Sequence, residues 1–295
     1  MAKKQSKSYP AFKKFLIFLV STFVMQTKGQ NEFDQYGPMG CAVFTDLKEA
    51  LKSSGKVYKL DLNYVKLEPK YYNKIGKLTD LMALRLRGNE INTYPEGFNK
   101  LIYLAYFASY NNDLTKFPDK IGQYFNLEYL EFQHSKIDSI PADIAYLKRL
   151  RSFKFGNTDD SLYIPKSFRY LKGIKDLSFE NVILDSLPTE LFRNEGIKFL
   201  YLSNTNTHYL TKHFERMPNL EVLVIENNPI SKIPFEIYKA EKLRLISLRN
   251  NKITSIPETI TELTELSLLD LRGNPIPEQE IEKLKALLPG CNIKF

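Results

Sequence analysis

The stretch that decides the fold is LRLISLRNNKI at residues 243–253, where apolar residues hold positions one, four, six and eleven and Asn251 holds position nine. The same pattern occurs at residues 81–91 (LMALRLRGNEI) and 266–276 (LSLLDLRGNPI). Related stretches start every 23 or 24 residues, at Val57, Leu81, Leu104, Leu127, Leu150, Ile174, Ile197, Leu220, Leu243 and Leu266. A period of this length, kept in register through ten copies, predicts a solenoid of stacked repeats.

Each repeat predicts a short strand followed by a turn. Apolar residues at positions four and six alternate with outward-facing neighbours, so successive strands can stack as a parallel sheet with one face in the core. Asn at position nine can both donate and accept hydrogen bonds, which suits a buried backbone turn. Most repeats have Pro fourteen residues after their start, as at Pro141 and Pro257, followed by apolar residues three apart. This arrangement indicates a short helical turn that begins at the proline.

The spacing resembles that of the leucine-rich repeat family, and in particular a bacterial type with 23-residue Pro-containing repeats. The resemblance covers about residues 57–288. It implies an α/β solenoid, a leucine-rich repeat horseshoe with a parallel concave sheet and short helical or 3-10 segments on the convex side. Function in such a fold is carried by its exposed surfaces.

The chain divides into four predicted parts. Residues 1–29 combine a Lys-rich start with the apolar run FLIFLVSTFVM at 15–25, which is typical of a signal peptide cleaved before Gln30. An uncleaved anchor is the alternative, although the run is too short to span a bilayer. Residues 30–56 are expected to form a flexible lead and a cap helix that starts after Thr45. Residues 57–276 hold the ten repeats, and 277–295 form a C-terminal cap helix and strand.

Charge and chemistry-bearing residues exclude several classes of function. Of the net charge of +8, six Lys lie in residues 1–29, which leaves 36 basic against 34 acidic residues and no basic footprint for nucleic acid. Cys41 and Cys291 lie in opposite caps, too far apart for a disulfide, and are expected to be free, mostly buried thiols. The three His residues lack a metal-binding or catalytic spacing. We therefore expect no catalytic site, metal or cofactor, and no enzyme.

Positions three, five and seven of each repeat are predicted to line the concave face of the sheet. Two apolar groups there are candidate partner-binding residues, because contiguous exposed apolar surface marks interaction sites. The candidates are Tyr106, Tyr110, Tyr129 and His134 in one group and Phe199, Tyr201, Val222, Val224, Leu245 and Leu268 in the other. The alternative is that the ascending loop covers position three, so that these residues form the edge of the core. Opposite charges on adjacent repeats are expected to pair, as in Asp61/Arg85, Glu131/Lys154 and Glu226/Arg249.

These observations predict a secreted or cell-surface bacterial protein, in the periplasm or on the outer surface, that recognises another protein through its concave face. Rigid strands lose little entropy when they bind a partner. Neither nucleic acid nor an integral membrane span after signal cleavage is expected. A glycan ligand, stacked on tyrosine faces, and a structural role in the envelope are the alternatives.

Overall fold

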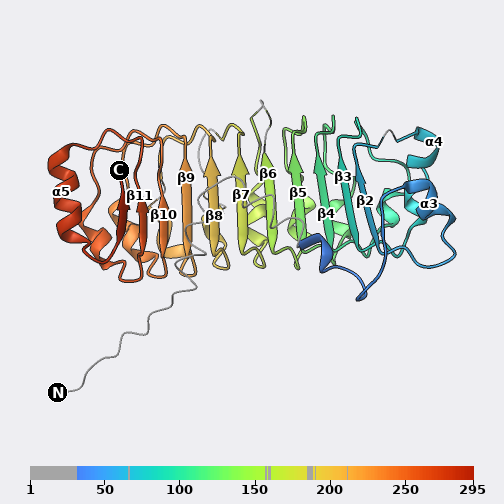
Figure 1. Ribbon diagram of the computed structural model, residues 1–295, viewed down its shortest axis with the longest axis horizontal. Helices are drawn as coiled ribbons and strands as arrows, with labels where there is room; N and C mark the ends of the chain where they lie inside the picture. The colour runs from blue at the N-terminus through green and yellow to red at the C-terminus, as the bar shows by residue number, and fades with distance from the viewer. Residues whose placement is uncertain are drawn as a thin grey trace, which may run out of the picture.

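The computed structural model describes residues 32–65, 67–156, 158, 161–184, 189, 191–210 and 212–295. The predicted signal peptide lies outside these residues. In the described part of the chain, twelve parallel strands form one open sheet in sequence order, from β1 to β12. Figure 1 shows them side by side along the long axis of the molecule. The repeats therefore stack as a leucine-rich repeat solenoid, as the sequence predicts.

The strands share one length through most of the solenoid. They are β1 (Val43–Phe44), β2 (Lys59–Asn63), β3 (Ala83–Arg87), β4 (Tyr106–Tyr110), β5 (Tyr129–Gln133), β6 (Ser152–Gly156), β7 (Asp176–Glu180), β8 (Phe199–Ser203), β9 (Val222–Glu226), β10 (Leu245–Ser247), β11 (Leu268–Asp270) and β12 (Asn292–Lys294). The pairing register follows the repeat, so that Leu84 lies opposite Phe107 and Phe107 opposite Leu130. These residues at position four are buried in a single continuous core.

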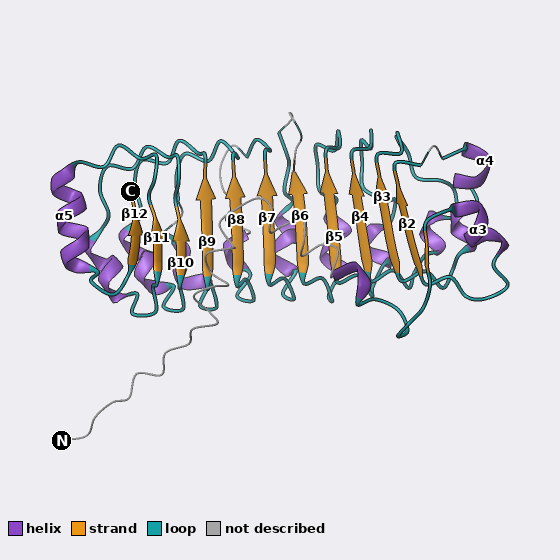
Figure 2. Cartoon of the chain, viewed as in Figure 1, coloured by secondary structure: helices purple, strands orange, loops and turns teal. Residues whose placement is uncertain are grey.

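Short helical turns form the second layer of the solenoid, behind the sheet in Figure 2. Nine are 3-10 turns in the described residues: η1 (Ile75–Lys77), η2 (Phe98–Lys100), η3 (Ile121–Gln123), η4 (Ala142–Tyr146), η5 (Lys166–Tyr170), η6 (Leu191–Arg193), η7 (His213–Arg216), η8 (Phe235–Lys239) and η9 (Glu258–Glu262). Pro141 and Pro257 stand directly before η4 and η9, as predicted. In contrast, η2 and η3 follow Gly97 and Lys120 and begin three residues after their repeat prolines.

Where position nine of a repeat is Asn, its side chain joins that repeat to the one before it. The Oδ1 atom of Asn112 accepts from the backbone N–H groups of Asn89 (3.1 Å) and Ile91 (3.3 Å), and its Nδ2 donates to the carbonyl of Leu86 (3.1 Å). Asn228 makes the equivalent bonds to Thr205 and Thr207. This confirms that the amide satisfies buried backbone groups, which would otherwise destabilise the turn.

Helices close the two ends of the core. At the front are α3 (Leu47–Lys52) and α4 (Pro69–Tyr72), and at the back is α5 (Glu278–Leu287), followed by β12. The cap residue of α3 is Asp46, not Thr45 as predicted, because the Asp46 carboxylate accepts from the N–H groups of Lys48 (2.6 Å) and Glu49 (3.0 Å).

Both cysteines are free, as predicted. They are half-buried, however, and not mostly buried as the sequence suggested. Burial raises the pKa of the Cys291 thiol to about 11, although a backbone hydrogen bond at Leu269 opposes the shift.

Candidate functional site

Two side-chain clusters lie on the outer face of the sheet, opposite the core. We call this surface the sheet face. The aromatic cluster, over β3 to β5, contains Ala83, Tyr106, Ala108, Tyr129 and Phe33, with half-buried Tyr36 and Tyr110 at its side. The aliphatic cluster, over β8 to β11, contains Tyr201, Val222, Leu245 and Leu268, with half-buried Phe199 and Val224. The structure thus groups nine of the ten predicted site residues as the sequence did.

The tenth predicted residue, His134, lies outside both clusters. It follows β5 in a left-handed conformation with φ of 52°, and its side chain is exposed. Its backbone N–H donates to the carbonyl of Gly156 at 3.0 Å. His134 is therefore part of the turn that leaves the strand.

A stacked pair of tyrosines forms the floor of the aromatic cluster. Tyr106 and Tyr129 lie opposite each other in the register of β4 and β5. Their ring centroids are 4.4 Å apart and the ring planes differ by 5°. The spacing of adjacent strands, about 4.8 Å, brings such rings into contact when both stand at the same position of their repeats.

The Glu131 carboxylate accepts hydrogen bonds from two tyrosine hydroxyls of the cluster. Glu131 Oε2 accepts from Tyr110 OH at 2.8 Å and from Tyr129 OH, and Glu131 Oε1 accepts from Gln133 Nε2 at 3.3 Å. Burial, and then the negative charge of Glu131, raises the pKa of both Tyr110 and Tyr129 well above the ordinary value. Both hydroxyls therefore stay protonated and act as fixed donors.

Buried cations complete this floor. Arg85 pairs with Asp61 at 2.9 Å, which confirms one predicted charge pair, although both side chains are nearly buried. Lys154 lies over the Tyr129 ring, with its Nζ atom 5.1 Å from the centroid. Burial alone would lower the pKa of Lys154, but the charges of Glu131 and Asp176 outweigh this and raise it. Lys154 is therefore held as a cation within the cluster.

Of the three predicted charge pairs, Asp61/Arg85 is among the ion pairs of the described residues, whereas Glu131/Lys154 and Glu226/Arg249 are not. The Glu226 carboxylate instead accepts from Ser247 Oγ at 2.5 Å. Between the two clusters, burial raises the pKa of Glu180, and the charges of Glu131 and Glu226 raise it further. Charge on the sheet face is therefore governed by local hydrogen bonds as much as by adjacent opposite charges.

The segment before β1 covers the aromatic cluster. Residues 32–34 form one helical turn, drawn in blue across β4 and β5 in Figure 1. Phe33 is fully buried, with its ring edge against Tyr106 at 5.3 Å and 86°. The Arg85 guanidinium carbon lies 4.4 Å from the Phe33 ring centroid. Residues 32–36, which we call the lead, are thus ordered against the sheet, whereas the sequence predicted a flexible segment.

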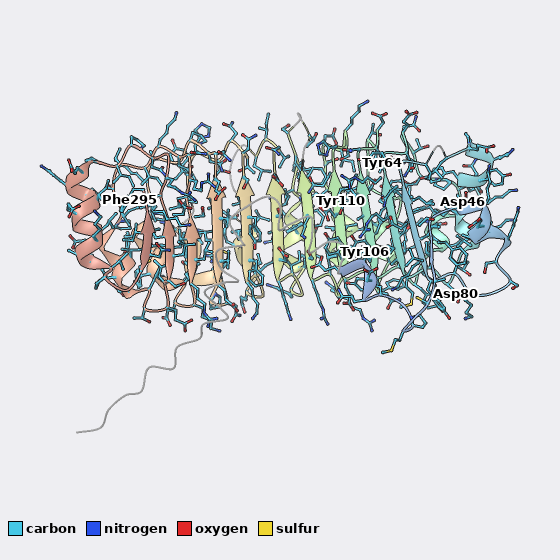
Figure 3. The ribbon with its side chains drawn as sticks, in the orientation of Figure 1. Asp46, Tyr64, Asp80, Tyr106, Tyr110 and Phe295 are labelled. Carbon is cyan, nitrogen blue, oxygen red and sulfur yellow. The ribbon has the colours of Figure 1, made fainter. Side chains whose placement is uncertain are left out.

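The lead changes what the sheet face exposes. Tyr106 and Tyr129 are 0% and 1% exposed, so the expectation that they are open to solvent is wrong. The alternative was that the ascending loop of each repeat covers position three. In the aromatic cluster the covering residues are instead Phe33 and Tyr36, which pack directly on Tyr106. Tyr110, labelled beside Tyr106 in Figure 3, remains half-buried. Nothing in the repeat pattern points to Phe33, because it lies outside the repeats.

The aliphatic cluster is also more buried than predicted. Leu245 and Leu268 are 1% and 4% exposed, and Tyr201 and Val222 are 8% and 6% exposed. Phe199 and Val224 are half-buried at its edge. Within this cluster, Phe199 and Val224 are therefore the least buried of the predicted site residues.

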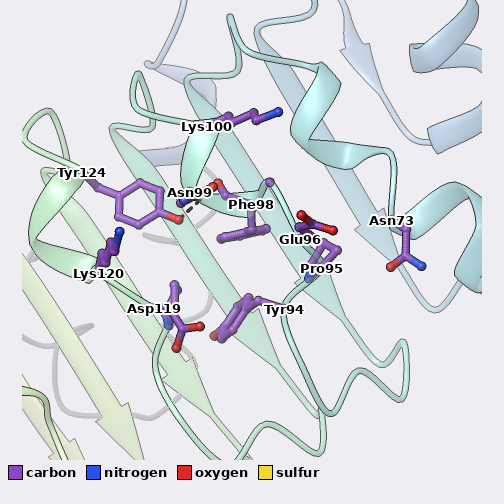
Figure 4. A pocket seen from close by; sticks show the side chains of 12 residues that line it. Asn73, Tyr94, Pro95, Glu96, Phe98, Asn99, Lys100, Asp119, Lys120 and Tyr124 are labelled. Carbon is purple, nitrogen blue, oxygen red and sulfur yellow. Dashed lines mark hydrogen bonds between the residues drawn. The ribbon is translucent and has the colours of Figure 1, made fainter.

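A groove of about 820 Å³ lies on the other side of the solenoid, around η2 and η3 (Figure 4). Tyr124 OH donates across it to the Phe98 carbonyl at 3.2 Å. Its lining residues include no His, Cys or Ser. Among the residues that the structure describes, no group of three or more His, Cys, Asp or Glu could hold a metal ion.

Comparison with known proteins supports the repeat assignment. Residues 218–276 match the family model described as Leucine rich repeat. An internalin (inlF) from Listeria monocytogenes shares 17% identity with a TM-score of 0.57, over 75% of each chain. A leucine-rich repeat protein from Leptospira interrogans shares 22% identity with a TM-score of 0.35, over 86% of this chain and 100% of the other. The internalin likeness and the parallel sheet agree on the leucine-rich repeat fold.

One curated relative also matches. Disease resistance protein UNI from Arabidopsis thaliana is 30% identical over 88 residues, which are 28% of this chain and 10% of that protein. The match therefore spans about a tenth of the relative's length. It supports the leucine-rich repeat character of the matched segment. In the described residues, no helix is both long and apolar enough to cross a membrane.

Proposed function

We propose that this leucine-rich repeat solenoid is a non-enzymatic recognition protein that binds another protein through its sheet face. The leucine-rich repeat fold suggests interaction with proteins, and the position of the site on the sheet face is our inference. The observation that carries it is the partial exposure of Phe199 and Val224 at the edge of the aliphatic cluster, in a fold whose working surfaces are its exposed faces.

The geometry supports this proposal through preorganisation. The in-register strands hold the side chains of both clusters at fixed positions, so that binding needs little reordering. Phe199 on β8 and Val224 on β9 are the half-buried residues of the aliphatic cluster, where they combine apolar area with partial exposure. Partly exposed apolar residues around a buried centre are typical of an interface.

We further propose that the protein is bacterial and is secreted or displayed on the cell surface. Support comes from the Lys-rich start and the apolar run at residues 15–25, which together are typical of a signal peptide. Cleavage before Gln30 would leave the lead close to the new N-terminus. The aromatic cluster would then be covered by the first residues of the mature protein.

The test is a cross-linking pull-down from the native cell surface, with paired variants. Phe199→Glu and Val224→Glu place charge at the edge of the aliphatic cluster and should reduce recovery of the partner at least tenfold. Tyr146→Glu, in η4 on the opposite side and 65% exposed, is the matched control and should retain the partner. N-terminal sequencing of the recovered protein should read from Gln30.

Equal recovery of the partner with Phe199→Glu, with Val224→Glu and with the unmodified protein would show that the sheet face around the aliphatic cluster is not the interface. Loss with Tyr146→Glu alone would place the interface on the side of the helical turns. Unfolding of a variant is monitored by circular dichroism, so that loss of fold is not mistaken for loss of contact.

A further inference from the structure

We propose that the aromatic cluster is a peptide-binding site for a helical turn carrying two aromatic side chains three residues apart, and that Phe33 and Tyr36 occupy it from the same chain. This inference deepens the proposed function, because it names the kind of partner segment that the front of the sheet face would accept. A partner that presents such a turn would displace the lead and take its place.

The floor of this site is built by the repeats alone. The stack of Tyr106 on Tyr129 and the ion pair of Arg85 with Asp61 both join residues of successive strands. The hydroxyls of Tyr110 on β4 and of Tyr129 on β5 both donate to Glu131 on β5, so these contacts also lie within the repeats. Removal of the lead leaves these contacts in place, so a preformed aromatic and cationic surface would become open to solvent.

The lead makes the contacts of a bound peptide. Phe33 packs against Tyr106 and under Arg85, and the Tyr36 ring lies 5.7 Å from the Tyr106 ring. Lys59 Nζ donates to the backbone carbonyl of Asp34 at 2.5 Å, which holds the main chain between the two aromatic residues. One turn of helix brings residues three apart to the same side. The two rings therefore approach the sheet together.

The residues between the two rings face away from the site. Asp34 and Gln35 are exposed, and only Phe33 is fully buried in the lead. Recognition thus uses aromatic rings and a backbone carbonyl more than side-chain charge. The ligand class is an aromatic peptide turn, and acidic residues beside the rings contribute less.

Two glycines with positive φ lie between the lead and the solenoid. Gly37 has φ of +91° and Gly40 has φ of +72°, and strand β1 begins at Val43. A left-handed residue directly after Tyr36 lets the chain turn away from the site towards the cap. The lead can therefore leave the sheet face without breaking the pairing of β1 with β2. While it is attached, a short tether of this kind competes at an effective concentration of about millimolar.

The experiment supplies the lead as a separate peptide. A fluorescein-labelled peptide of residues 32–40, EFDQYGPMG, is titrated by fluorescence anisotropy with the full chain and with its Phe33→Ala, Tyr36→Ala double variant. We call this double variant the vacated variant, because it lacks both rings of the lead. We expect it to bind the peptide at least tenfold more tightly than the unmodified chain does. A peptide with both aromatic residues replaced by Ala should lose this binding, whereas one with Glu32→Gln and Asp34→Asn should keep it.

A third protein variant tests the location. Ala83→Leu, added to the vacated variant, fills the floor beneath the Phe33 position and should weaken peptide binding at least tenfold, since Ala83 is fully buried in this cluster. Equal binding to unmodified and vacated chains would overturn the proposal. The proposal would also be overturned if replacement of the two aromatic residues of the peptide left binding unchanged, or if replacement of its acidic residues abolished binding.

A second measurement needs no substitution in the protein. Excess peptide added to the unmodified chain should speed hydrogen exchange at the backbone N–H of Tyr36, which donates to the Phe33 carbonyl at 3.4 Å. Unchanged exchange at saturating peptide would count against displacement. None of these results needs the natural partner. A failed peptide test would leave recognition at the aliphatic cluster standing, and a failed pull-down at Phe199 would leave the peptide site standing.

Discussion

The two clusters on the sheet face reach similar burial by different means. The aliphatic cluster is assembled from strands β8 to β11. The aromatic cluster combines strands β3 to β5 with Phe33, which is about 70 residues away in sequence from Tyr106. Equivalent repeat positions can thus be buried by neighbouring strands or by a segment from outside the repeats. The aliphatic cluster therefore resembles the edge of a fixed core, whereas the aromatic cluster resembles an occupied binding site.

The largest expected effect tests whether the aliphatic cluster is core. Leu245→Ala removes a side chain that is 1% exposed and should lower the free energy of unfolding by about 2–5 kcal/mol. The control Ile102→Ala changes a residue that is 40% exposed and should cost about 0.5 kcal/mol or less. Urea-induced unfolding measures both losses, provided that the dependence of the unfolding free energy on urea concentration is the same for the variants and the unmodified protein. Equal losses for the two variants would show that Leu245 is not packed as core.

A smaller effect separates the two clusters from each other. The ring contact between Phe33 and Tyr106 should give a coupling free energy of about 0.5–1.5 kcal/mol in a double-mutant cycle with Ala. Phe33→Ala and Leu245→Ala lie in different clusters and should add to within about 0.5 kcal/mol. Coupling between Phe33 and Leu245 as strong as that with Tyr106 would mean that the sheet face behaves as one unit.

The smallest effect concerns the charge between the clusters. Because the pKa of Glu180 is raised, its ionised form opposes folding at pH 7, and this cost falls as pH drops through the raised pKa towards 4.5. Glu180→Gln should therefore stabilise the protein at pH 7, by less than about 1 kcal/mol because solvent screens a partly exposed group. The advantage should disappear below pH 4.5, as measured by thermal unfolding across pH. The exposed Glu262→Gln is the control, and an equal gain there would contradict the assignment.

The repeat pattern predicted the parts of the fold that depend on local spacing. Positions such as Leu84 and Asn112 recur at a fixed interval, and each residue has one neighbour to meet on the next repeat, so their roles follow from the sequence. The cap of α3 was missed by one residue because Thr45 and Asp46 are both good capping residues, and only the backbone geometry selects between them.

The site was harder to predict because its contacts break the period. Glu131 and Lys154 were placed on adjacent strands correctly, but the hydroxyls of Tyr110 and Tyr129 also compete for the carboxylate. Phe33 belongs to no repeat, so no spacing relates it to Tyr106. A weak signal was present in the sequence, since EFDQY places two aromatic residues three apart in an otherwise polar segment. Its docking position depends on tertiary packing, which a periodic pattern does not encode.

The strictly sequential order of the sheet has a mechanical consequence. Every strand pairs only with the strand before it and the strand after it in the sequence. Paired residues between β2 and β11 are 23 or 24 positions apart. Tension applied to the two ends would therefore peel the molecule from its extremities, one coil at a time, and not shear the whole sheet at once. The first piece to come away at the amino end would be the turn around Phe33, so that a pull at this terminus would uncover the tyrosines before any coil had opened.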